Sequence, residues 1–84
     1  MYFIYLIQCG DNTLYTGTAK NVDRRFIEHK IGKGARYTRA RKVVKVLYTE
    51  KYDSKSQALK REAQIKGWRR EKKLNLIKFG KPVI

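Results

Sequence analysis

The sequence predicts an α+β fold, in which a small antiparallel sheet of three strands is flanked by helices. Three short apolar segments, at residues 2–8, 13–18 and 43–52, have the composition of strands. A length of 84 residues is enough for one domain, residues 1–84, with one modest core. Helices are predicted over residues 22–31, 54–67 and 69–79, the last closed by Gly80 and Pro82.

The first strand is predicted to lie in the middle of the sheet. Both of its alternating sets of side chains are apolar or aromatic, which indicates that helices or loops cover both of its faces. Following the chain direction through the hairpin and the first helix makes the third strand antiparallel to the first, so the expected order is 2-1-3. One face of the third strand is expected to carry Val44, Val46 and Tyr48.

The first two strands are predicted to form a hairpin, because residues 10–12 are the turn formers Gly, Asp and Asn. If the loop centres on Gly10, Tyr5 and Tyr15 are directly opposed on one face of the sheet. A slip of one residue would place them on opposite faces.

The first helix follows Asn21, which is a suitable N-cap, and ends near Ile31 before Gly32. At about 100° per residue, Arg25 and His29 lie one turn apart on the side of the helix that also carries Val22 and Phe26. Polar groups suited to chemistry therefore border the stripe that should be buried.

The second helix is predicted from a capping box, in which Ser54 is followed three residues later by Gln57. Glu62 falls inside the apolar arc of this helix, where a carboxylate without a partner is costly. A cation must meet it. The side chains expected to face the core are Ala58, Leu59, Ala63 and Ile65.

The charge of the chain points to a polyanionic partner. There are 21 Lys and Arg residues against 7 Asp and Glu residues, giving a net charge of +14 and a pI near 10.2. Nucleic acid is the first candidate. A membrane surface is disfavoured because no long amphipathic helix has a clean basic face and no apolar run reaches membrane-spanning length. Cys9 is the one cysteine, which fits a soluble protein of the reducing cytoplasm.

Residues 32–45 contain no acid and are predicted to form an exposed basic loop. Its cations would bind the phosphate backbone, which provides affinity without reading sequence. The residues expected to bind nucleic acid are Lys33, Arg36, Tyr37, Arg39, Arg41 and Lys42.

Phosphodiester hydrolysis needs an activated water and positive charge on the phosphate. Glu62 is the best candidate metal ligand, because the other six acids are expected at turns, helix ends or polar faces. One carboxylate suffices for a single Mg²⁺ or Mn²⁺ ion that also takes waters and phosphate oxygens. The alternative is a structural ion pair of Glu62 with Arg25 or Arg61.

The remaining candidates have ordinary alternatives too. Arg25 can hold a phosphate with two parallel hydrogen bonds, or be a solvated arginine. His29 can move a proton, or only pack. Tyr5 and Tyr15 can orient water or pack in the sheet, and a phenol acts as a base near neutral pH only if cations lower its pKa.

The series Phe3-Ile4-Tyr5, Tyr15-Thr16-Gly17, Arg25 and His29 resembles the signature of the GIY-YIG endonuclease superfamily. The resemblance covers roughly residues 2–75 and implies that fold. It implies that Tyr5 activates or orients water, that Tyr15 hydrogen-bonds in the same site and that Arg25 stabilises the phosphate. By the same resemblance, His29 helps proton transfer and Glu62 holds the metal.

Two departures from the signature stand out. Phe3 replaces a glycine and should fill space beside the site, whereas Thr16 replaces an isoleucine and looks innocuous. Residues 32–39 resemble the small stand-alone bacterial members related to Slx-type nucleases, in which Tyr37 would join the site.

The function expected is a metal-dependent DNA endonuclease, structure-specific and acting in DNA repair or recombination. DNA is favoured over RNA, a monomer is expected, and a partner protein would supply target choice because no element looks like a base-reading helix. One alternative is a catalytically silent nucleic-acid-binding module with the same fold. Another is an RNA-associated protein, which would need exposed aromatic side chains for stacking.

Overall fold

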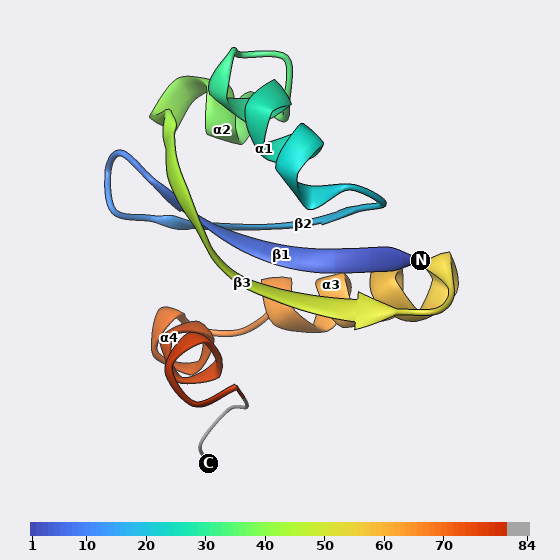
Figure 1. Cartoon of the computed structure of the whole chain (residues 1–84). Coiled ribbons are helices and arrows are strands. Elements are labelled where there is room, and N and C mark those ends of the chain that lie inside the picture. The colour runs from blue at the N-terminus through green and yellow to red at the C-terminus, as the bar shows by residue number, and fades with distance from the viewer. Residues whose placement is uncertain (81–84) are drawn as a thin grey trace.

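The computed structural model describes residues 1–80 and confirms the α+β fold with three antiparallel strands in the order β2-β1-β3 (Figure 1). The predicted stop at Pro82 lies outside the described residues. Within residues 1–80, none of the helices is long and apolar enough to cross a bilayer. The elements are β1 (Tyr2–Cys9), β2 (Leu14–Ala19), α1 (Val22–Lys30), α2 (Arg36–Arg41), β3 (Val43–Tyr52), α3 (Lys55–Lys66) and α4 (Arg70–Phe79).

The sheet separates two layers of helices. Figure 1 shows α1 and α2 over one face, with α3 and α4 over the other. Ile4 and Leu6 of β1 pack toward α3 and α4, whereas Tyr5 and Ile7 pack toward α1, and all four are at most 1% exposed. Burying an aliphatic side chain of this size contributes about 1.5–3 kcal/mol, so the central strand anchors both cores.

The buried stripe of α3 differs from the predicted one. Ala58 and Ile65 are buried as expected, but Leu59 is 43% exposed and Ala63 is also exposed. The stripe that faces the sheet runs through residues 58, 61, 62 and 65, which is the i, i+3, i+4, i+7 pattern of one helix face. Two of its members are charged, so apolar character alone identified the wrong neighbours.

The predicted basic loop is wrong for residues 36–41, which form the helix α2. Thr38 of this helix is fully buried, although the helix also carries Arg36, Arg39 and Arg41. Its hydroxyl contacts His29 of α1 and donates to the carbonyl of Ala35 at 2.9 Å. Because this helix is held by a tertiary contact rather than by an apolar stripe, its sequence has no helical period of hydrophobic residues.

The predicted alternation of β3 is wrong at Val44, which is 52% exposed, whereas Val43 is 7% exposed. The pairing of β3 with β1 shifts register between Leu6 and Ile7 and again between Gln8 and Cys9. Each shift changes which residues of β3 face the helices, so a simple period of two does not hold along the strand.

Candidate functional site

The β1–β2 register sets the geometry of the two tyrosines. Tyr5 pairs with Gly17 and Tyr15 pairs with Ile7, so the predicted direct opposition of Tyr5 and Tyr15 is wrong. They are instead diagonal neighbours on one face, with ring centroids 6.3 Å apart. The turn is longer than a two-residue hairpin loop, and Asn12 adopts a φ of 68°, which displaces the pairing by two residues.

Gly17 makes room for the phenol of Tyr5. A Cβ atom at position 17 would lie 2.9 Å from Cε1 of Tyr5 and closer still to its Cζ and hydroxyl oxygen. A glycine inside a strand often marks such a close approach, and this was the signal by which the role of Gly17 could have been recognised. The signature spacing of tyrosine and glycine is thus a packing requirement of Tyr5 itself.

His29 lies behind Tyr5 and is 1% exposed. Its Nε2 is 2.9 Å from the hydroxyl of Tyr5, and its Nδ1 is 2.7 Å from Oγ1 of Thr38. The Thr38 hydroxyl donates its hydrogen to the carbonyl of Ala35, so Thr38 Oγ1 can only accept from Nδ1–H. The amide of Ala35 also points at Nδ1, at 3.3 Å, a contact that the opposite tautomer would need. Because the contact with Thr38 is the shorter one, we assign the tautomer in which Nδ1 carries the hydrogen and Nε2 accepts from the hydroxyl of Tyr5.

Close approach of the backbone at Gly34 supports this arrangement. A Cβ atom at position 34 would lie 2.7 Å from Cε1 of His29 and closer to Nδ1. The sequence predicted that Gly34, with Gly32, ends the first helix, but it predicted no contact of Gly34 or Thr38 with His29. In the sequence, the only signal for this return of the chain to His29 is Gly32, Gly34 and Thr38 within a basic segment.

Burial is the largest cause of the pKa shifts of Tyr5 and His29. Desolvation raises the pKa of Tyr5 to about 12, against the opposing hydrogen bond and positive charge of Arg25. Desolvation also lowers the pKa of His29, with a further lowering from the charge of Arg25. At neutral pH Tyr5 is a neutral phenol and His29 a neutral imidazole, so the Arg25 charge alone does not produce a tyrosinate.

Three rings form the centre of the candidate site. The centroid of His29 is 5.9 Å from that of Tyr5 and 5.3 Å from that of Tyr15. Arg25 is near enough to the Tyr5 phenol to lower its pKa, so the structure brings all four predicted catalytic residues together. Their placement is established, while their catalytic roles stay predictions.

Arg25 is half-buried and engaged by a neighbour on its own helix. Its Nη1 is 3.0 Å from Oε1 of Glu28, with each side chain 35% exposed. A guanidinium has five N–H donors, so this pair leaves others for a phosphate. The side chain borders a hollow of about 210 Å³. The residues that line this α1 hollow are Ala19, Lys20, Asn21, Arg24, Arg25 and Glu28.

Glu62 reaches the site from α3. Its side chain is 17% exposed, and Oε2 is 3.5 Å from Nζ of Lys66, one helical turn later. The charge of Glu62 is close enough to contribute to the raised pKa of Tyr5. Lys66 in turn lies 6.0 Å from the ring centroid of Tyr15. The predicted alternative partners, Arg25 and Arg61, pair with other acids, and the i+4 spacing was the signal for Lys66.

Glu50 corrects the expectation that only Glu62 is shielded. Its side chain is 16% exposed and accepts from Arg61 Nε at 2.9 Å and Nη2 at 3.1 Å. The hydroxyls of Tyr48 and Tyr52 donate to it at 2.6 and 2.7 Å. Burial raises the pKa of Glu50, but these hydrogen bonds outweigh it and the pKa is lowered. A carboxylate saturated in this way is a structural ion pair rather than a metal ligand.

Glu62 is compatible with one Mg²⁺ or Mn²⁺ ion, and a single-ion site stays a prediction. Within residues 1–80, no three His, Cys, Asp or Glu side chains gather where they could hold a metal. Glu62 has one described cationic partner, at the long distance of 3.5 Å, and so keeps lone pairs for a cation. Mg²⁺ accepts a single carboxylate when phosphate oxygens and waters complete its shell.

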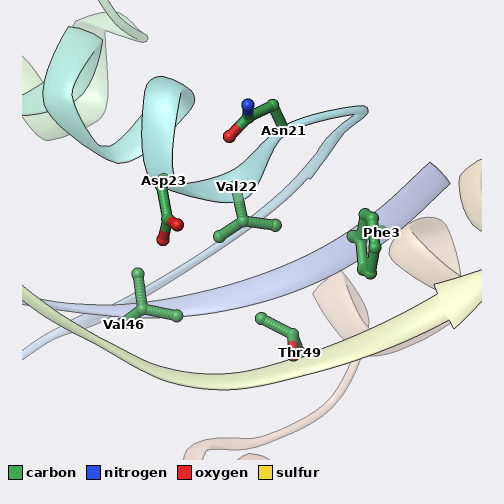
Figure 2. A pocket seen from close by; sticks show the side chains of 6 residues that line it. All are labelled: Phe3, Asn21, Val22, Asp23, Val46 and Thr49. Atoms are coloured by element: carbon green, nitrogen blue, oxygen red, sulfur yellow. The ribbon is translucent and has the colours of Figure 1, made fainter. Parts of the chain in front are cut away.

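Phe3 does not fill the ring cluster. Figure 2 shows its ring beside a separate hollow of about 340 Å³ between the start of α1 and β3. None of Tyr5, Tyr15, Arg25, His29 and Glu62 lines this hollow. Its lining residues are Phe3, Asn21, Val22, Asp23, Val46 and Thr49.

The predicted backbone-binding cations are exposed on and around α2. Arg41 also forms an ion pair with Asp11, at 3.0 Å. The side chain of Tyr37 lies outside what the structure describes, so its predicted place in the site is not assessed. Binding of nucleic acid by this group stays a prediction. The exposed cations are Lys33, Arg36, Arg39, Arg41 and Lys42.

Comparisons with known proteins agree with the geometry. Residues 1–75 match the family model described as GIY-YIG catalytic domain. A UPF0213 protein of Staphylococcus saprophyticus is 49% identical over 79 residues, covering 94% of this chain and 96% of that protein. A UPF0213 protein of Staphylococcus aureus strain USA300 is 51% identical over 77 residues, covering 92% and 94%. The solution structure of a UPF0213 protein from Bacillus halodurans matches with a TM-score of 0.59 and 38% identity, over 93% of this chain and 84% of that one.

Proposed function

Because the chain belongs to the GIY-YIG catalytic domain family, we propose that it is a metal-dependent endonuclease that hydrolyses phosphodiester bonds of DNA. The observation that carries this proposal is the convergence of four polar side chains. Tyr5, Tyr15 and His29 form one ring cluster, and Arg25 lies near enough to its central phenol for its charge to lower the phenol pKa. Tyrosine, histidine and arginine at one point supply a proton path and a phosphate-binding charge.

In this proposal the proton of the attacking water leaves through Tyr5. The neutral phenol accepts a proton from water while it donates its own to Nε2 of His29, across the 2.9 Å hydrogen bond. Thr38 keeps His29 in the receiving tautomer by accepting from Nδ1–H. A phenol with a pKa of about 12 is a poor base alone, so the histidine behind it is what makes water activation feasible near neutral pH.

Positive charge meets the phosphate from two sides. Arg25 approaches from α1 and is suited to two parallel hydrogen bonds with phosphate oxygens. Lys66 approaches from α3 next to the Tyr15 ring. Glu62 would hold one Mg²⁺ or Mn²⁺ ion, which when bound neutralises developing charge on the phosphate oxygens.

The substrate and setting are proposed more narrowly than the family requires. We propose DNA rather than RNA, cleaved at a particular structure as the resemblance of residues 32–39 to Slx-type nucleases implies, in DNA repair or recombination in the cytoplasm. Exposed cations bind backbone without reading sequence, so target choice would come from DNA shape or from a partner protein acting on a monomer.

A binding module that does not cut is the second candidate. The observation in its favour is that both charged site residues already have partners, Arg25 with Glu28 and Glu62 with Lys66. An active enzyme must exchange these contacts for substrate and metal. A silent module would keep them.

Incubation with labelled plain, nicked, flap and branched DNA and matched RNA, with EDTA, Mg²⁺ or Mn²⁺, separates the two candidates. The nuclease proposal predicts cleavage of DNA that depends on the metal and is fastest on one structure. Binding of all these substrates without cleavage of any would replace it with the module.

A further inference from the structure

A second basic hollow lies at the start of the edge strand β2, away from the ring cluster. This α4 hollow has a volume of about 210 Å³ and is lined by Thr13, Leu14, Arg70 and Lys73. Thr13 and Leu14 are the residues through which the chain enters β2, and Arg70 and Lys73 belong to the start of α4. Figure 1 shows α4 on the face opposite α1, so this hollow opens on the other side of β2 from Arg25.

The two cations of the α4 hollow lack acidic partners. Within residues 1–80, neither Arg70 nor Lys73 forms an ion pair, and no acid lines the hollow. Lys73 is partly buried, and desolvation together with the charge of Lys66 lowers its pKa. Arg70 and Lys73 both line the hollow and no acid among its lining residues offsets their charge, so an anion would be stabilised there.

Lys66 connects the α4 hollow to the candidate site. Its ammonium group contacts Glu62, lies over the ring of Tyr15, and is near enough to Lys73 to affect its pKa. Tyr15 directly follows Leu14, so the hollow begins one residue from the site. Successive side chains of a strand point to opposite faces, which places Leu14 toward α4 and Tyr15 toward α1.

Basic hollows therefore lie at both ends of the same edge strand. Ala19, the last residue of β2, lines the α1 hollow with Arg24 and Arg25, while Leu14, the first, lines the α4 hollow. Six strand residues span about 17 Å at ~3.4 Å per residue.

We propose that one nucleic-acid strand runs along the edge strand β2 and places a backbone phosphate, next to the cleavage site, in the hollow lined by Arg70 and Lys73. The assignment rests on the proposed function only in taking the polyanion to be nucleic acid. Arg70 supplies planar donors and Lys73 a point charge, the pairing suited to a phosphodiester. This subsite adds to the predicted cations of α2, none of which lines the α4 hollow.

The test compares two variants that lose the same charge. In Arg70→Gln/Lys73→Gln the α4 hollow loses both cations, and in Lys51→Gln/Lys55→Gln two exposed cations are lost near the start of α3. Circular dichroism checks that each variant is folded. Affinity for a labelled DNA duplex is measured by fluorescence anisotropy in EDTA, so no strand is cut, over a series of salt concentrations.

The proposal predicts that the hollow variant binds more weakly and that its slope of log K against log salt is shallower by about 0.9, the value for one phosphate. The matched control keeps the wild-type slope. Equal slopes for all three proteins would overturn the subsite, even if the wild type cuts DNA. A reduced slope in the hollow variant alone would uphold the subsite even if no protein cuts DNA, so the two proposals fail separately.

Discussion

Replacing Gly17 with alanine tests the packing that creates the candidate site. The added methyl group would lie 2.9 Å from Cε1 of Tyr5 and closer still to the hydroxyl end of the ring. Tyr5 is 1% exposed, so its ring cannot swing into solvent without unpacking β1 from α1. Overpacking of this kind costs about 1–3 kcal/mol, and loss of the hydrogen bond to His29 adds about 1 kcal/mol.

A loss of about 2–4 kcal/mol lowers the Tm of a domain of this size by roughly 8–30 °C, measured by circular dichroism. Gly67→Ala is the matched control, because the nearest atom to its Cβ would be 3.5 Å away and the backbone φ there is −78°. Tyr5→Leu should relieve the clash, so Gly17→Ala and Tyr5→Leu together should cost less than the sum of the two. Additive losses, or a Gly17→Ala protein as stable as Gly67→Ala, would refute the close approach.

Three further predictions follow from the same contacts. Thr38→Val should lower the Tm by about 5–15 °C and slow cleavage without changing affinity for DNA, because Nδ1–H of buried His29 loses its acceptor. Thr38→Ser keeps a hydroxyl and should retain the wild-type Tm and cleavage rate. Equal cleavage rates for the two variants would contradict the assigned tautomer. The folded-state pKa of His29 is lowered, so the unfolded state binds more protons and stability should fall as pH drops below about 6.5. The Tm measured from pH 5 to 7.5 should show this dependence in the wild type and less of it in His29→Gln. Equal slopes of Tm against pH in the two proteins would show that His29 is not the source. Thr16→Val should raise the Tm by about 5–10 °C, because the Thr16 hydroxyl is buried without a hydrogen-bond partner among residues 1–80. An unchanged or lower Tm would mean that the Thr16 hydroxyl has a hydrogen-bond partner.

Local signals predicted most of the fold. Caps at Asn21 and Ser54 marked two helix starts, and their side chains accept from backbone amides at 3.0 and 3.2 Å. The apolar run of β1 identified the central strand. The helix α2 was missed because Thr38 holds it to His29, a contact between elements that a local pattern does not contain.

The site was predictable in its members but not in its geometry. Residue types and spacing identified Tyr5, Arg25 and His29, whereas the diagonal placement of the tyrosines depends on a turn conformation at Asn12. The sequence also does not reveal that Glu50 is shielded from solvent, because its partner Arg61 comes from α3, eleven residues along the chain. Charged pairs between elements override the apolar pattern that helical-wheel reasoning relies on.

The measurement that tests the central claim most directly is metal-dependent cleavage of the preferred DNA substrate by wild type, Glu62→Gln, Arg25→Ala and Glu50→Gln. Glu50 is the matched carboxylate, since it is as shielded as Glu62 but saturated by Arg61. The account predicts that Glu62→Gln and Arg25→Ala lose cleavage while still binding DNA. It predicts that Glu50→Gln, though less stable, cuts normally below its Tm. Wild-type protein that cuts nothing with Mg²⁺ or Mn²⁺, or Glu62→Gln and Arg25→Ala proteins that cut as fast as wild type, would contradict it.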